Sequence, residues 1–144
     1  MAQAIQSNVL EETLETDQQK ILIVDDYDPN LMIAGNYLEI FGYEYDVAKN
    51  GLDALSKVRS NDYLAILMDI QMPELDGMET TMLIRNLEYK EKRDRQPIIA
   101  MTAHTLAGDC NACFAAGMDA YLSKPFNPNE LQAMLTHFSS MRSA

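Results

Sequence analysis

The chain has 144 residues, of which 47% are hydrophobic, and its formal net charge is −11. This length and composition are typical of one globular domain with a real core and argue against a large disordered protein. Nucleic-acid binding is not expected, because Lys and Arg supply the affinity for phosphates and only 11 are present. No apolar run reaches the roughly 18 residues of a membrane helix, and the N-terminus does not resemble a signal peptide. We therefore expect a cytoplasmic protein that makes no membrane contact.

Two cysteines, Cys110 and Cys113, lie close together without further cysteines. A zinc site would need two more ligands, and His104 and His137 are too few and too scattered to supply them. We expect the cysteines to be small core residues of a helix, with metal or redox chemistry as the alternative.

Composition divides the chain into three parts. Residues 1–19 are polar and acidic, and are predicted to be a flexible leader or a linker. Residues 20–138 contain the regular pattern of apolar segments and are predicted to form one domain. Residues 139–144 are expected to be a short C-terminal tail.

Five short apolar runs between turn residues are typical of β-strands. They are Ile21–Val24, Tyr43–Ala48, Leu64–Met68, Pro97–Met101 and Ala120–Leu122. The second run is rich in aromatic residues and alternates loosely, so it is predicted to lie nearer the edge of a sheet. The third has no polar break, which indicates a strand buried on both faces.

The segment after the first strand is predicted to form a helix that ends at Gly42. Asp28 is expected to be its N-cap, Pro29 suits the first helical position, and Gly42 suits the C-cap. Helical spacing predicts that the residues facing the sheet are Leu31, Ala34, Leu38 and Phe41.

Two further helices are predicted before and after the third strand. The first ends near Ser60, and the residues it is expected to bury are Leu52, Leu55 and Val58. The second runs from about Met78 to Tyr89, and its candidates for the buried face are Met78, Met82, Leu83 and Leu87.

The C-terminal half carries two more predicted helices. One runs from about Thr105 to Ala116, and the last ends at about Phe138. Asn127 or Asn129 is expected to cap the last helix. The charged stretch from Lys90 to Gln96 is expected to be a solvated helix end and loop.

Regular alternation of strand and helix predicts an α/β fold with a parallel sheet and helices on both faces. Such a sheet gathers the C-terminal ends of its strands along one edge, where open α/β sheets bind ligands. The polar residues at four of these ends are therefore expected to converge, namely Asp25 with Asp26, Asp69, Thr102 and Lys124.

These residue types together indicate phosphoryl transfer onto an aspartate. Three crowded carboxylates repel one another unless a cation is bound or a pKa is raised, and Mg²⁺ prefers such oxygen ligands. Lys124 and Thr102 offer a positive charge and a donor to phosphoryl oxygens, while Asp69 can act as a nucleophile. The alternative for single residues is that Asp25 or Asp26 caps a helix and that Lys124 pairs with an acid.

Four motifs in this order resemble those of the response-regulator receiver domain of two-component signalling. They are Ile-Leu-Ile-Val-Asp25-Asp26, Met68-Asp69-Ile-Gln-Met-Pro73-Glu-Leu-Asp-Gly77, Ile-Ala-Met-Thr102-Ala103 and Lys124-Pro125-Phe126. The resemblance spans about Lys20 to Phe138. It implies a flavodoxin-like (βα)5 fold with the strand order 2-1-3-4-5.

The resemblance also assigns roles at the acidic edge. It implies that Asp69 takes a phosphoryl group from a phosphohistidine. Mg²⁺ would be bound by Asp26 and Asp69, by Asp25 through a water, and by the backbone carbonyl of Gln71. Lys124 would pair with the phosphate. A receiver of this kind is a signalling phosphoacceptor that promotes only its own phosphorylation and dephosphorylation, so we do not expect an enzyme.

The resemblance further implies a conformational switch. Thr102 would move toward the phosphoryl group, the Ala103 N–H would be a further donor, and Tyr121 would turn inward when Thr102 moves. An ordinary half-buried strand residue is the alternative for Tyr121. The bond between Lys124 and Pro125 is expected to be cis.

Partners follow from the same resemblance. We expect a histidine kinase or a histidine phosphotransfer domain as the phosphoryl donor, because the residues of these motifs are similar to those in receivers of hybrid histidine kinases. Met32 and Ile40 are predicted to be exposed on the first helix, where the donor would dock; the alternative for Met32 is a contact with the sheet. The output is expected to be a protein partner or a homodimer, through the face made by the fourth helix, fifth strand and fifth helix.

Two rival functions fit the sequence less well than the switch. A haloacid-dehalogenase-like phosphatase needs a second acid two positions after the nucleophile, and Gln71 occupies that position. A pseudo-receiver, acting as a phosphorylation-independent interaction module, typically lacks an acid or the lysine, and all are present here.

Overall fold

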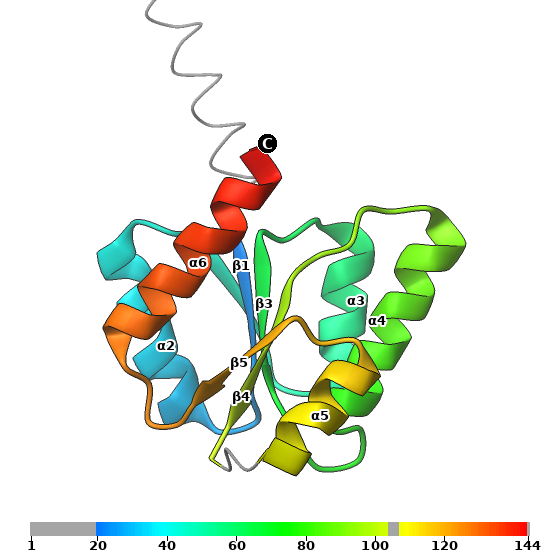
Figure 1. Cartoon of the computed structure of the whole chain (residues 1–144), viewed down its shortest axis with the longest axis horizontal. Coiled ribbons are helices and arrows are strands. Elements are labelled where there is room, and N and C mark those ends of the chain that lie inside the picture. The colour runs from blue at the N-terminus through cyan, green and yellow to red at the C-terminus, as the bar shows by residue number, and fades with distance from the viewer. Residues whose placement is uncertain (1–19, 104–106, 144) are drawn as a thin grey trace, which may run out of the picture.

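In the computed structural model, five parallel strands form one sheet between two layers of helices (Figure 1). The structure describes residues 20–103 and 107–143. The strands are β1 (Ile21–Val24), β2 (Tyr45–Ala48), β3 (Ala65–Asp69), β4 (Ile98–Thr102) and β5 (Ala120–Ser123). Their spatial order is β2-β1-β3-β4-β5, so the predicted fold class and strand order are confirmed.

The helices cover both faces of the sheet. They are α2 (Asp28–Phe41), α3 (Gly51–Ser60), α4 (Gly77–Glu91), α5 (Ala107–Ala116) and α6 (Pro128–Ser143). Figure 1 shows α2 and α6 on one side of the sheet, and α3, α4 and α5 on the other. Each crossover between parallel strands is therefore a helix, as the alternating sequence pattern predicts.

Alternate residues of the central strands enter two separate cores. Ile21 and Ile23 of β1 pack under α2 and α6, whereas Leu22 and Val24 pack under α3, α4 and α5. All four side chains are completely buried. Burial of each such side chain contributes about 1.5–3 kcal/mol, so the apolar runs at the centre of the sheet account for much of the driving force for folding.

The start of α2 differs from the prediction. Tyr27, with extended backbone, is the N-cap, and Asp28 is already helical, so the prediction that Asp28 caps this helix is wrong. The Asp25 carboxylate accepts a hydrogen bond of 3.0 Å from the Tyr27 N–H, which forms a tight turn and starts the helix one residue earlier. At the other end, Gly42 has φ +89° and is the C-cap, as predicted.

The buried faces of α3 and α4 also differ from the prediction. Leu52, Met82 and Leu83 are exposed, although apolar spacing placed them in the core. The two helices approach closely, because a Cβ on Gly51 would overlap the Thr80 hydroxyl. Small and polar residues therefore fill this contact, and the buried set of the two helices is Gly51, Ala54, Val58, Gly77, Thr80, Thr81, Ile84 and Glu88.

Several element ends lie elsewhere than predicted. β2 begins at Tyr45, and α6 continues to Ser143 instead of ending at about Phe138. Asn127 caps α6, since its side chain accepts a 2.9 Å hydrogen bond from the Asn129 N–H. The stretch before β4 is not wholly solvated, because Gln96 is only 1% exposed and accepts a 2.7 Å hydrogen bond from the Tyr63 N–H.

The fourth predicted helix is observed as α5, within the range that the sequence predicts. Its Cys113 is buried in the core under this helix, as predicted. The predicted helix start at Thr105 and the residue His104 lie outside the described residues, as does the side chain of Cys110.

Gly77 fixes the loop between β3 and α4. Its N–H donates a 2.9 Å hydrogen bond to the Ile70 carbonyl. A Cβ at this position would overlap the carbonyl oxygen of Asp69 and lie 2.9 Å from the Ile70 Cα. The helix then starts with a capping box, in which the Asp76 side chain accepts from the Glu79 N–H at 2.8 Å. Only glycine therefore lets α4 begin against the end of β3.

Replacing Gly77 by alanine is expected to destabilise the fold by about 2–3 kcal/mol, because the added methyl group pushes α4 away from the strand end. Chemical denaturation of the Gly77→Ala variant measures this. Gly42→Ala is the matched control, since a Cβ at Gly42 would meet nothing within 4 Å and only the left-handed backbone is strained. That control should lose about 1 kcal/mol. Equal losses at both positions would contradict the close-approach argument.

Candidate functional site

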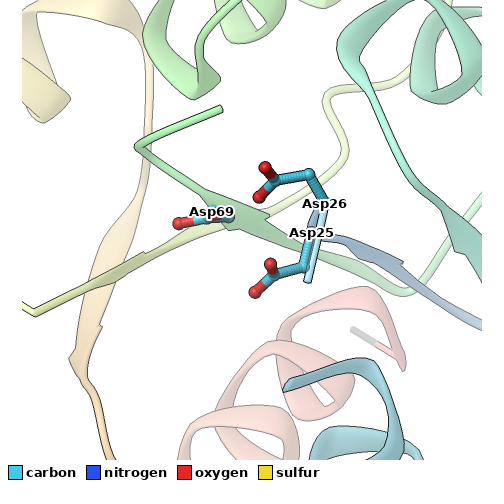
Figure 2. A group of neighbouring side chains, drawn as sticks. All are labelled: Asp25, Asp26 and Asp69. Atoms are coloured by element: carbon cyan, nitrogen blue, oxygen red, sulfur yellow. The ribbon is translucent and has the colours of Figure 1, made fainter. Parts of the chain in front are cut away.

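The parallel register brings three aspartates from two strands together. Val24 of β1 lies opposite Met68 of β3, so the residues that follow, Asp25 and Asp69, lie side by side at the same edge. Asp26 continues from Asp25. Figure 2 shows the three side chains grouped at the ends of these strands.

The three carboxylates form a compact cluster. One oxygen atom from each lies within 4.8 Å of the others. Asp25 is completely buried and Asp69 is 4% exposed, whereas Asp26 is exposed. Two charges are thus withdrawn from water while the third faces it, so the cluster is open on one side. Oxygen donors in this arrangement match the ligands that Mg²⁺ prefers.

Lys124 places a positive charge between the two buried carboxylates. Its Nζ lies 3.0 Å from Asp69 Oδ1 and 3.2 Å from Asp25 Oδ2. The residue follows β5, and its N–H donates a 2.8 Å hydrogen bond to the carbonyl of Thr102 at the end of β4. Pairing of β5 with β4 therefore fixes the backbone position from which the Lys124 side chain extends. The Lys124–Pro125 bond is cis, as predicted.

The environment changes the pKa of both charged partners. Burial raises the pKa of Asp69 to about 6; the hydrogen bond from Lys124 lowers it and repulsion from Asp25 raises it. Burial lowers the pKa of Lys124, but its hydrogen bonds and attraction to Asp69 and Asp25 outweigh burial, so the pKa lies above its usual value. A cation bound beside Asp69 would favour its charged form and lower this pKa.

Backbone donors orient the two buried carboxylates. Asp25 Oδ1 accepts from the Tyr27 N–H at 3.0 Å, and Asp69 Oδ1 accepts from the Gln71 N–H at 3.3 Å. Gln71 itself is exposed in the loop after β3. Sequence reasoning missed the Tyr27 contact. A carboxylate followed two residues later by a helix start could have indicated it, because Asp side chains commonly accept from the N–H two residues on.

The remaining predicted site residues lie on β4, directly after it, or on β5. Thr102 ends β4 and is 7% exposed, and Ala103 follows it and is exposed. Thr102 borders a cavity of about 700 Å³ between the loop after β3 and α5. Tyr121 of β5 is 40% exposed, and its ring lies edge to face with Phe114 of α5 at 6.4 Å. Tyr121 is thus on the surface in this conformation.

A sequence profile of the response regulator receiver domain matches residues 21–136. The chain belongs to this family. It is 35% identical to "Histidine kinase 5" of Arabidopsis thaliana over 88% of the chain, but this covers 16% of that kinase. It is 34% identical to the sensor histidine kinase GacS of Pseudomonas protegens over 91% of the chain and 14% of that protein. The receiver therefore spans about one sixth of the length of these relatives.

Two solved structures are especially similar to the receiver. One is the receiver domain of a sensor histidine kinase from Pseudomonas aeruginosa with magnesium in its active-site cleft, at 40% identity, a TM-score of 0.75 and coverage of 84% and 97%. The other is in the co-crystal structure of the Saccharomyces cerevisiae histidine phosphotransfer protein Ypd1 with the Ssk1 receiver, at 31% identity, a TM-score of 0.80 and coverage of 89% and 93%.

Membership of this family makes the receiver a signalling domain of two-component phosphorelay systems and not a classical enzyme. The acidic cluster brings together three of the residues that the sequence predicts as magnesium ligands, Asp25, Asp26 and Asp69. Within the described ranges, none of the helices combines the length and the apolar character needed to cross a bilayer.

Asp69→Asn is expected to stabilise the metal-free receiver at pH 7.5 by roughly 1–3 kcal/mol. The folded-state pKa of Asp69, about 6, lies above the ordinary value of 3.8, so folding favours the protonated form. That stabilisation is complete below pH 3.8 and is lost as the pH rises through 6. The advantage of the variant should therefore shrink as the pH falls between these values.

Thermal and urea unfolding with a chelator present, from pH 3.5 to 8, measure this difference. Asp94→Asn is the control, because Asp94 is exposed in the loop after α4 and lies outside the acidic cluster, so its replacement should change stability by less than about 0.5 kcal/mol. An Asp69→Asn variant less stable than the natural chain at pH 7.5 would contradict the expected sign.

Proposed function

We propose that this receiver takes a phosphoryl group from a phosphohistidine onto Asp69 and signals by a change of its surface. One observation carries the proposal: the Asp69 carboxylate lies within a triad of acids and 3.0 Å from the Lys124 ammonium. A carboxylate in this position would contact a bound cation on one side and the Lys124 ammonium on the other. An acid that only caps a helix, or only forms an ion pair with a lysine, would not need the other acids beside it.

In the proposed reaction, a carboxylate oxygen of Asp69 attacks the phosphorus atom of the donor. An O–P bond forms as the P–N bond to the histidine breaks, and the leaving imidazole keeps the electron pair and takes up a proton. Lys124 remains charged, since its pKa is raised, and would pair with a phosphoryl oxygen. The acyl phosphate on Asp69 is the product that carries the signal.

The residues present fit Mg²⁺ as cofactor. Asp26 and Asp69 would be direct ligands, Asp25 would act through a water, and the Gln71 backbone carbonyl would complete the protein ligands. The exposed Asp26 and the buried Asp25 suit a metal that keeps several waters. When bound, Mg²⁺ supplies positive charge that neutralises the carboxylates and the phosphoryl oxygens.

The switch would begin at Thr102, which lies one residue beyond the strand position opposite Asp69 and borders a cavity. We propose that its hydroxyl and the Ala103 N–H bind phosphoryl oxygens after transfer. Tyr121 would then leave its exposed position. The face built from α5, β5 and α6 would change with it and recognise a protein partner or a second copy.

Incubation with acetyl phosphate and Mg²⁺ is expected to add one phosphoryl group to the protein, detected by intact-mass measurement. The adduct should be labile to hydroxylamine, because an acyl phosphate is an activated carboxyl group. It should be absent in Asp69→Asn and strongly reduced when a chelator removes the metal.

Asp76→Asn is the matched control, since Asp76 is an aspartate of the same loop that caps α4 and lies outside the cluster. This variant should gain the group normally. No adduct on the folded natural chain would instead support the pseudo-receiver, a phosphorylation-independent interaction module. Sustained turnover of small phosphate esters would support a phosphatase.

The proposed donor is a histidine kinase or a histidine phosphotransfer domain. Two large apolar side chains of α2, Met32 and Ile40, are 67% and 76% exposed, as predicted, and Ile33 between them is 45% exposed. The helix begins three residues after Asp25 and so starts beside the acidic edge. A donor docked on α2 would bury these side chains and bring its phosphohistidine toward Asp69.

Met32→Ala should slow phosphotransfer from phosphorylated Ypd1, used as a surrogate donor, about fivefold at subsaturating donor. Phosphorylation by acetyl phosphate should stay unchanged, because a small donor needs no docking surface. Met82→Ala is the control, since Met82 is 55% exposed on α4, on the other side of the sheet. Equal effects of both substitutions would contradict docking on α2.

A further inference from the structure

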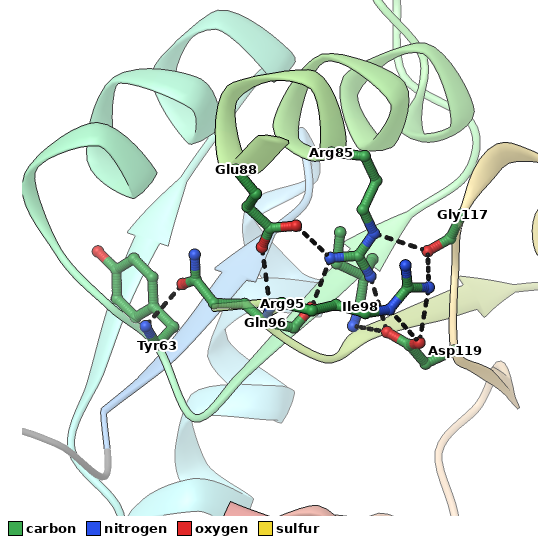
Figure 3. A network of polar contacts seen from close by, with 8 residues as sticks. All are labelled: Tyr63, Arg85, Glu88, Arg95, Gln96, Ile98, Gly117 and Asp119. Carbon is green, nitrogen blue, oxygen red and sulfur yellow. Dashed lines mark hydrogen bonds and ion pairs between the residues drawn. The ribbon is translucent and has the colours of Figure 1, made fainter. Parts of the chain in front are cut away.

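A second polar cluster lies at the opposite end of β5 from Lys124. Its centre is the ion pair between Arg85 of α4 and Asp119, the residue before β5, at 2.7 Å (Figure 3). The side chains are 14% and 20% exposed, so the pair is largely shielded from water. The two residues are 34 positions apart in the sequence.

Arg85 joins four segments through one guanidinium group. Besides the bond to Asp119, Nε donates to the Gly117 carbonyl at 2.9 Å, and Nη1 donates to Glu88 Oε1 and to the Gln96 carbonyl, each at 2.8 Å. The arginine thereby ties α4 to the end of α5, the start of β5 and the chain entering β4. Gly117 has φ +111°, and a Cβ there would lie 3.0 Å from the Arg85 Cγ.

Asp119 ties the start of β5 to the start of β4. Its Oδ2 accepts from the Ile98 N–H at 2.9 Å, and its own N–H donates to the Ile98 carbonyl at 2.8 Å. Its Oδ1 accepts two hydrogen bonds from Arg95, at 2.9 and 3.1 Å. The Asp119 carboxylate thus accepts from a β4 N–H at the point where the backbone pairing of β4 with β5 begins.

β5, like the other edge strand β2, has few buried side chains to hold its register. It is a four-residue edge strand, and β4 is its only neighbour in the described sheet. Of its residues only Leu122 is fully buried, so few side chains oppose a slip along β4. A slip of one residue would turn every β5 side chain to the other face and carry Lys124 away from the carboxylates.

We infer that Arg85 is a positioning residue for Lys124, because its ion pair with Asp119 fixes the register of β5 against β4. The start of β5 is held by this cluster, and four residues later the Lys124 ammonium reaches Asp25 and Asp69. The inference about the register of β5 rests on strand pairing alone, whereas the expected effect on phosphorylation rests on the proposed function.

The test compares Arg85→Lys with Arg93→Lys. Lysine keeps the charge but cannot reproduce the planar donor geometry of arginine. Arg93 is a matched control, since it is 16% exposed in the loop after α4 and its Nη2 binds Asn61 and Asp62, before β3. Asp119→Asn is a second test variant from the other side of the pair, and it decides the question if Arg85→Lys does not fold.

Amide hydrogen exchange is the first measurement and needs no phosphorylation. In Arg85→Lys, the β5 amides and the Lys124 N–H should exchange about tenfold faster relative to amides of the β1–β3 pairing. Arg93→Lys should shift both sets together. If the β5 amides follow the central strands in Arg85→Lys or, where that variant does not fold, in Asp119→Asn, the inference is overturned.

The second measurement separates Mg²⁺ binding from phosphorylation. Mg²⁺ affinity of Arg85→Lys should not fall, because the acids stay at the ends of β1 and β3 and a displaced Lys124 would compensate them less, while the rate with acetyl phosphate at saturating Mg²⁺ should fall about tenfold. A parallel loss of both would indicate general damage and overturn the positioning role. If the natural chain is not phosphorylated at all, the proposed function fails and hydrogen exchange still decides the register.

Discussion

Two carboxylates withdrawn from water, Asp25 and Asp69, share one ammonium group from Lys124, and the rest of the structure serves to hold these three groups together. Buried like charges are tolerated only where an opposite charge or a proton compensates them. Lys124 compensates in part, and the pKa of Asp69 still rises to about 6. The negative charge of the cluster is therefore only partly compensated, and its exposed side, at Asp26, is open to a further positive charge. A bound cation would supply that charge.

Both ends of the strands help to hold the two carboxylates and the ammonium group together. At the site edge, parallel pairing of β1 with β3 and of β4 with β5 delivers the acids and the lysine from separate strands. Gly77 lets α4 start directly against the end of β3, which shapes the loop after Asp69. At the opposite end of the strands, Arg85 and Asp119 hold the edge strand β5 in register. The proposed switch at Thr102 and Tyr121 would rearrange within this frame.

Much of this was predictable from the sequence, and the failures have a common origin. The apolar runs of β1 and β3 indicated buried strands correctly, because a strand covered on both faces needs no polar residue. The faces of α3 and α4 were predicted wrongly at Leu52 and Met82, which are exposed. Close helix contact favours small residues and satisfied hydroxyls over large apolar ones, and this preference depends on the neighbouring helix. Gln96 illustrates the same point, since a polar residue of a charged loop becomes buried by accepting from Tyr63.

The sequence by itself determined which residues stand at the strand ends, the α/β class and, through the four motifs, the family. Those features are local, since strand and helix periods and turn residues act over a few positions. Only the tertiary structure decided how near the acids lie, which of them are buried, that Asp69 has a raised pKa, and that Arg85 reaches Asp119. Distances between groups on different strands depend on register and helix packing, and no local pattern specifies the partner of a side chain 34 residues away.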